Sequence, residues 1–87
     1  MSLSSEEKII KTCDLAKNLL LEKNRSYGDS ALNPANIFAK GNAVENLSCR
    51  IDDKLMRIKN SGLNDLTEDT VLDLIGYLVL LYVALND

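Results

Sequence analysis

The residues best suited to chemistry form a row of basic side chains in the middle of the chain. Arg50, Lys54 and Arg57 are separated by four and then three residues, so they share one face of a helix. A guanidinium fork donates two parallel hydrogen bonds to phosphate oxygens. The row therefore indicates a phosphate-binding surface or, as is more usual for such rows, a solvated face or a set of internal ion pairs.

Acidic residues near the end of the chain are able to meet that row. Asp69 and Asp73 lie four residues apart at the start of an otherwise apolar segment. A carboxylate beside apolar groups must be paired or bind a metal, because an unpaired buried charge is costly. In one hypothesis these carboxylates pair with Arg50 and Lys54. In the other, Asp53, Asp69 and Asp73 converge on Mg²⁺, which takes oxygen ligands.

The segment NRSYGDSALNP, residues 24–34, is a second candidate for ligand contact. It is longer than a connection between helices in a small bundle needs. Gly28 allows a sharp turn, and Tyr27 is able to stack on a base, a contact worth about 1–3 kcal/mol in single-strand binders. In the alternative, Tyr27 packs as an anchor and Asp29 or Ser30 caps a turn. The donors offered to phosphate oxygens here are Lys23, Arg25 and Ser30.

Helices are expected to position these residues. Apolar side chains recur at helical spacing, and no segment alternates with a period of two, so we predict an all-α domain without a sheet. The expected bundle has three long helices and one short helix within a single domain, residues 1–87. They run from Ser4 or Ser5 to about Asn24, from Asn33-Pro34 (carrying Ile37 and Phe38) to Gly41, from about Asn42 to Asn60, and from about Thr67 to about Leu85.

The stretch LIGYLVLLYVAL, residues 74–85, is apolar all the way round. It is shorter than the ~20 residues that cross a bilayer, so we expect a buried helix and no membrane contact. A chain of 87 residues has few other elements to surround it. We therefore predict a homo-oligomer formed through the helix at residues 67–85. The alternative is a central helix in a monomer.

Composition excludes several classes of function. The net charge of −3 disfavours general nucleic-acid binding, which needs an excess of Lys and Arg. Histidine is absent, and Cys13 and Cys49 have no CxxC spacing, which argues against zinc sites and His-dependent triads. We read both cysteines as buried apolar groups of a reducing compartment. The N-terminus MSLSSEEK shows no signal peptide, so a cytoplasmic location is expected (the host cytoplasm for a viral protein).

Three motifs in order carry a family resemblance: KNRSYGDS, RIDDKLMRIKN and EDTVLDLIGYLVLL. They resemble the Lys-x-x-x-Tyr-Gly-x-Ser loop, the Arg-Ile-x-Asp-Lys-Leu-x-Arg helix and the Glu-(x)n-Asp-Thr-Leu-x-Asp-Leu-x-x-Tyr helix of the first of the phage and bacterial families called nucleotide modification associated domains. The resemblance covers roughly residues 20–85. The residues at pattern positions are Lys23, Tyr27, Gly28, Ser30, Arg50, Ile51, Asp53, Lys54, Leu55, Arg57, Asp69, Thr70, Asp73, Leu74 and Tyr77.

That family is similar in turn to the MazG-type all-α nucleoside triphosphate pyrophosphohydrolases. Those enzymes hold Mg²⁺ with Glu-x-x-Glu on one helix and Glu-x-x-Asp on the next. Here Arg50, Asp53 and Lys54 stand where the first acidic pair is expected. On the last helix, neither Glu68 nor Asp69 has the three-residue spacing to Asp73. Fewer carboxylates on one face imply weaker metal binding, whereas the cationic replacements keep phosphate recognition.

Three hypotheses from different classes follow. The first is capture of a nucleotide or cyclic nucleotide in a basic pocket at a subunit interface without turnover, as in viral sequestration of a host signalling nucleotide; it needs no cofactor. The second is a Mg²⁺-dependent pyrophosphohydrolase that uses Asp53, Asp69 and Asp73. The third is a structural or protein-interaction module. The predicted ligand-binding residues are Lys23, Arg25, Tyr27, Ser30, Arg50, Lys54, Arg57 and Tyr77.

Overall fold

Three long helices make up most of the chain. The computed structural model describes residues 2–37 and 40–86. Helix α1 spans Ser5–Ser26, α2 spans Ala43–Ser61 and α3 spans Glu68–Leu85, and a 3₁₀ turn, η1, covers Asp65–Thr67 just before α3. No strand occurs in these two ranges, so the predicted all-α class is confirmed for them.

Local signals set the helix ends close to where the sequence predicts them. The Ser4 hydroxyl accepts a hydrogen bond from the backbone N–H of Glu7 at 3.1 Å, and the Glu7 carboxylate accepts one from the Ser4 N–H at 3.4 Å. This capping box begins α1. The Asn42 side chain caps α2 by accepting from the Glu45 N–H at 2.8 Å. Gly62 ends α2 with a φ of +79°, a conformation that glycine adopts without a steric penalty.

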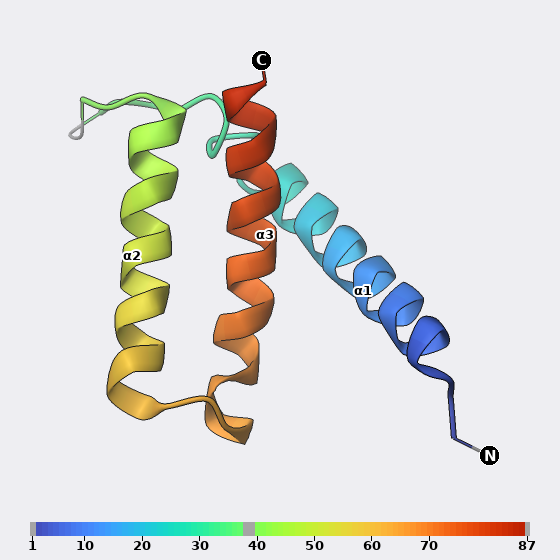
Figure 1. Ribbon diagram of the computed structural model, residues 1–87. Helices are drawn as coiled ribbons and strands as arrows, with labels where there is room; N and C mark the ends of the chain where they lie inside the picture. Colours follow the sequence, from blue (N-terminus) through green and yellow to red (C-terminus); the bar gives the residue numbers. More distant parts are fainter. Residues whose placement is uncertain (1, 38–39, 87) are drawn as a thin grey trace.

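Helices α2 and α3 form an antiparallel hairpin (Figure 1). The buried apolar side chains of the described residues are Leu47 on α2, at 1% exposure, and Leu80 on α3, at 9%. Thr67 closes the turn between the helices: its hydroxyl donates to the Gly62 carbonyl at 2.9 Å and accepts from the Asn64 N–H at 3.0 Å. The hairpin is therefore fixed at both its apolar contact and its turn.

The C-terminal end of helix α1 crosses α3, and the N-terminal part of α1 diverges from the hairpin (Figure 1). At the crossing, Leu20 borders a small cavity with Leu72 and Gly76. A Cβ on Gly76 would lie 3.4 Å from Leu20 Cδ1, so the glycine lets Leu20 approach the backbone of α3. No described residue of α1 is buried, and Ile9 near its start is 64% exposed. The N-terminal half of α1 is thus an arm that its own chain does not cover.

The predicted short helix at residues 33–41 does not form in its described residues. Asn33 does not act as a helix cap, because its side-chain amide donates to the Asp29 carboxylate at 2.6 Å. Asn36 has a φ of +53°, in the left-handed region, which a right-handed helix cannot contain. Phe38, which this helix was expected to carry, lies outside the described residues. The predicted count of four helices is therefore wrong.

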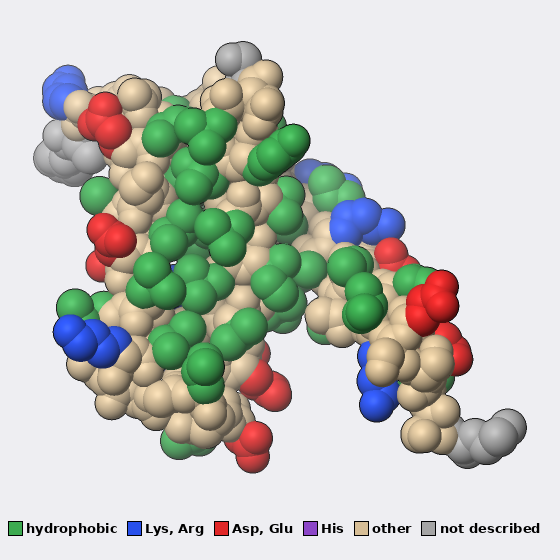
Figure 2. Space-filling model, in the orientation of Figure 1, with side chains coloured by type: hydrophobic (Ala, Val, Ile, Leu, Met, Phe, Trp, Pro, Cys, Tyr) green, Lys and Arg blue, Asp and Glu red, His purple; other side chains and the backbone are tan. Residues whose placement is uncertain are grey.

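Two predictions of burial are also wrong for the single chain. Residues 74–85 were expected to be buried, yet Leu80 is their one buried member, and Tyr82 is 71% exposed. Cys13 and Cys49 are both exposed. For residues 74–85 and Cys13, the reason is that α1 covers only part of α3 and leaves much of both helices open (Figure 2). No helix among the described residues combines the length and the apolar character that crossing a membrane requires.

Candidate functional site

Five of the eight predicted ligand-binding residues border one pocket of about 250 Å³, here called the Arg50 pocket. Its polar lining residues are Lys23, Asn24, Tyr27, Ser30, Arg50 and Tyr77. They come from α1, the loop that follows it, α2 and α3. The pocket is thus built where the end of α1 meets the hairpin, and its walls combine basic, aromatic and hydroxyl groups. Leu20, Ala31 and Leu80 supply apolar surface.

The end of α1 turns sharply and so presents the loop to the pocket. The Gly28 N–H donates to the Arg25 carbonyl at 3.3 Å, and the Asp29 N–H donates to the Asn24 carbonyl at 3.0 Å. These two bonds, with a φ of +61° at Gly28, define a Schellman motif. Asp29 follows with a φ of +62°. Gly28 and Asp29, both in the left-handed region, reverse the direction of the chain, which is the sharp turn predicted from Gly28.

One carboxylate links all three helices beside the pocket. Asp73 on α3 accepts from Lys23 Nζ on α1 and from Lys54 Nζ on α2, each at 3.1 Å. Partial burial raises the pKa of Asp73, but the hydrogen bonds and positive charges of Lys54 and Lys23 outweigh this effect and leave the pKa below its ordinary value of 3.8. Asp73 is therefore ionised at neutral pH, and the group of three side chains keeps a net positive charge.

Arg50 lies at the pocket and makes no ion pair within the described part of the chain. Its side chain is exposed at the pocket wall. A guanidinium in this setting is free to donate a bidentate pair of hydrogen bonds to an incoming phosphate or carboxylate. Arg50 is thus the clearest anion-binding group of the site.

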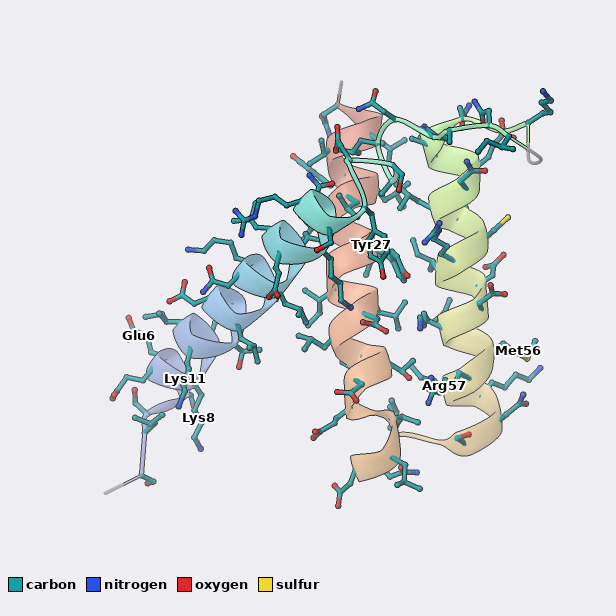
Figure 3. All side chains as sticks on the ribbon, turned by 180° about the vertical axis from the view of Figure 1, so that it is seen from behind. Glu6, Lys8, Lys11, Tyr27, Met56 and Arg57 are labelled. Carbon is teal, nitrogen blue, oxygen red and sulfur yellow. The ribbon has the colours of Figure 1, made fainter. Side chains whose placement is uncertain are left out.

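The remaining predicted contacts divide into neighbours of the pocket and residues away from it. Lys54 does not border the pocket but is joined to Lys23 through Asp73. Arg25 is absent from the lining, and Arg57 lies farther along α2 toward the turn (Figure 3). Tyr27 is 69% exposed, so it does not pack as the loop anchor considered as an alternative.

The predicted pairing of acids with the basic row is right for one pair only. Lys54 meets Asp73, as expected. Arg50 pairs with neither acid, and Asp69 makes no ion pair with any residue in 2–37 or 40–86. Asp69 instead borders a hollow between α1 and the start of α3. Lys23, which was assigned to phosphate binding alone, takes the second position on Asp73.

The expected convergence of Asp53, Asp69 and Asp73 on Mg²⁺ is not found. No three acidic or cysteine side chains of the described residues are grouped in a way that could hold a metal ion. Asp73 is held by two ammonium groups, which repel a divalent cation. The donor set therefore does not fit the magnesium site of the pyrophosphohydrolase hypothesis.

Sequence reasoning also missed members of the pocket. Asn24 was read as a helix-ending residue, Leu80 was read as part of a buried helix, and Leu20 was given no role at the site. Asn24 precedes Tyr27 by three residues, and Tyr77 precedes Leu80 by three, so helical spacing from a predicted residue places each of them near the pocket.

Comparison of the chain with models of known families, with curated proteins and with solved structures gives no match. The resemblance to the nucleotide modification associated domain family, and beyond it to MazG-type enzymes, therefore stays a prediction. The proposals below are based on the geometry of the Arg50 pocket.

Proposed function

We propose that this protein captures a nucleotide or cyclic nucleotide in the Arg50 pocket and releases it unchanged. The observation that carries the proposal is Arg50: a guanidinium with no ion pair to any residue in 2–37 or 40–86, at the wall of a pocket that also presents two tyrosines. A phosphate supplies the missing anion, and a base supplies a flat surface for aromatic contact.

Each wall of the pocket has a distinct role in this proposal. Arg50 donates to the phosphate oxygens, and Lys23 adds positive charge while it remains paired with Asp73. Tyr27, the more exposed tyrosine, stacks on the base. The pocket volume of about 250 Å³ is slightly below the roughly 300 Å³ at which small-molecule sites begin. Because the pocket is open to solvent, it suits a mononucleotide, or one half of a larger nucleotide, that extends partly outside it.

Capture without turnover fits the arrangement of the acids better than hydrolysis does. Pyrophosphate release in the MazG-type manner needs carboxylates that hold Mg²⁺ against the triphosphate. Asp73, which is ion-paired with the pocket residue Lys23, is neutralised by Lys23 and Lys54. Binding alone would lower the free concentration of a signalling nucleotide, which is the sequestering, anti-defence role suggested by the likeness to a phage family.

We also propose that the pocket lies beside a subunit interface, as the sequence predicts. Tyr77 and Leu80 bring α3 into its wall, and other residues of the same helix, such as Leu78 and Val79, present an uncovered apolar surface. A neighbouring subunit on that surface would restrict the exit of a bound ligand.

Titration calorimetry with linear and cyclic mono- and dinucleotides tests the proposal. At least one nucleotide is expected to bind and to be recovered intact after denaturation of the protein. Arg50→Ala should weaken binding about tenfold or more, because a hydrogen-bonded charged group contributes about 1.5–3 kcal/mol. Arg57→Ala is the matched control, since Arg57 lies on the same helix outside the pocket.

Two results would count against this assignment. The absence of heat with every nucleotide would overturn the proposal. Equal weakening by Arg50→Ala and Arg57→Ala would show that the charge of α2 acts in a general way and not through this pocket. Recovery of a converted ligand, with conversion abolished by EDTA, would support the pyrophosphohydrolase alternative instead.

A further inference from the structure

The single chain exposes more surface than a folded protein of its size normally does. Its accessible surface is 6817 Å², whereas a compact monomer of 9.6 kDa exposes about 5,100 Å². Its radius of gyration is 14.7 Å, against about 12 Å for a compact domain of this length. The excess of about 1,700 Å² lies within the share that one chain contributes to an obligate homodimer, roughly 1,000–2,500 Å².

The arm of α1 continues an apolar stripe beyond the point where its own chain covers it. Ile9, Cys13, Ala16 and Leu20 follow one another at helical spacing. Leu20 contacts the hairpin, whereas Ile9 is 64% exposed and Cys13 is exposed. The same face of α1 therefore packs against the hairpin at its C-terminal end and is exposed to solvent at its N-terminal end.

A groove between α1 and α3 runs beside that stripe. It has a volume of about 300 Å³, and its lining includes Cys13 and Leu21 from α1 and Val79 from α3. Hydrophobic side chains extend over the hairpin and onto α1 on the face seen in Figure 2, and α1 stands away from the lower part of α3 there. The space between the arm and the hairpin is open enough to admit side chains of another helix.

The arm receives little stabilisation from its own chain. It belongs to a continuous helix of 22 residues, but most helical stability in proteins comes from packing of an apolar face and not from propensity. The capping box at Ser4 and Glu7 stabilises its start but covers no apolar surface. A packing partner for the arm would resolve this.

We infer that a second copy of this chain packs against the apolar face of the α1 arm and the adjoining groove along α3. We favour a second copy as the partner because the excess surface of each chain falls within the range that one chain buries in an obligate homodimer. In addition, Leu47 and Leu80 are the only buried apolar residues in the described ranges, which is a small core for a chain of this length. The inference extends the predicted oligomer contact from α3 to α1 and does not depend on what the Arg50 pocket binds.

Sedimentation velocity on the full chain and two variants tests this surface. The wild type should have a mass of at least two chains. Ile9→Glu should reduce it to one chain, since a carboxylate would be buried without a partner. Met56→Glu is the matched control: Met56 is 53% exposed on the outer side of α2, away from the arm (Figure 3). It should leave the mass unchanged.

The two cysteines provide a readout that needs no substitution. Both are exposed in the single chain, but only Cys13 borders the groove. In the assembled protein a thiol reagent should modify Cys13 several-fold more slowly than Cys49. A wild type that sediments as one chain, an assembly that persists in Ile9→Glu, or equal rates at the two thiols would each overturn the inference.

Discussion

Asp73 acts at the level of a single side chain, because its carboxylate is the only one in the described residues that ties three helices together. Its partners, Lys23 and Lys54, lie on α1 and α2, each 3.1 Å from one of its oxygens. Replacement by Asn keeps the shape but removes the charge that both ammonium groups meet. The site therefore loses stability and gains repulsion between two lysines at the same time.

We predict that Asp73→Asn lowers the free energy of unfolding at neutral pH by about 1 kcal/mol, the scale of partly exposed ion pairs. Urea denaturation measures the change. Asp69→Asn serves as the control, because Asp69 has no ion pair among the described residues, and it should change stability by less than about 0.5 kcal/mol. Equal losses in the two variants would contradict the role given to Asp73.

The pH dependence of that difference has a definite sign. The pKa of Asp73 lies below its ordinary value of 3.8 in the folded chain, so the folded state favours the ionised form. The stabilisation is fully present above about pH 3.8 and is lost as the pH falls through the lower, folded pKa. The gap between wild type and Asp73→Asn should be constant near neutrality and should narrow in acid. A gap that widens below that pH would contradict the assignment.

At this scale the sequence predicted the kinds of residues in the site better than their pairing. Lys23, Tyr27, Ser30, Arg50 and Tyr77 do border one pocket. The partner of Asp73 on α1 is fifty residues away along the chain, and no spacing rule within a helix reports on it. Pairings between helices depend on crossing geometry, which the apolar pattern leaves undetermined.

Among the elements, the turn between α2 and α3 depends on one buried hydroxyl. Thr67 and Thr70 are both buried, at 2% and 1% exposure. The hydroxyl of Thr67 bonds to Gly62 and Asn64, whereas that of Thr70 has no hydrogen-bond partner among the residues that the structure describes. Comparing substitutions at the two threonines therefore measures the free-energy difference between a buried hydroxyl that is hydrogen-bonded and one that is not.

We expect Thr67→Val to lower the free energy of unfolding by about 1–3 kcal/mol, because the Asn64 N–H and the Gly62 carbonyl lose their partner. Thr70→Val should be neutral or stabilising, since it replaces an unsatisfied hydroxyl with a methyl group of similar shape. Thermal unfolding followed by circular dichroism distinguishes them. A larger loss at Thr70 than at Thr67 would contradict this account of the turn.

The helix ends show what the sequence determines locally. Ser4, Asn42 and Gly62 act within a few residues of themselves, and the observed boundaries agree with the prediction to within about two residues. The short helix failed for a different reason. Its start, Asn33, is bonded to Asp29 in the preceding loop, and Asn36 adopts a left-handed conformation. The Asn33-Pro34 pair favours a helix start locally, but the hydrogen bond to Asp29 and the backbone conformation of Asn36 prevent the helix.

For the whole molecule, the exposed apolar surface is the reason to infer an association of copies. Helix α1 contributes no buried residue, and the helix predicted to be buried has a single buried apolar member, Leu80. The sequence indicated the excess of apolar residues on residues 74–85 correctly. It did not indicate that α1 would share this exposure, because a helical stripe looks the same whether its partner is in the same chain or in another.

If the folded state is an association of copies, its midpoint of thermal unfolding must depend on concentration. Mass action stabilises the folded assembly as the chain concentration rises, since only the folded state associates. We therefore predict that the Tm of the wild type increases steadily over a hundredfold (about two decades) range of concentration. Ile9→Glu should unfold at a lower Tm that does not change with concentration, because its arm cannot be covered. Scanning calorimetry at several concentrations measures both. A wild-type Tm independent of concentration would mean that the hairpin and the crossing of α1 suffice alone, and that the uncovered arm has no partner of its own kind.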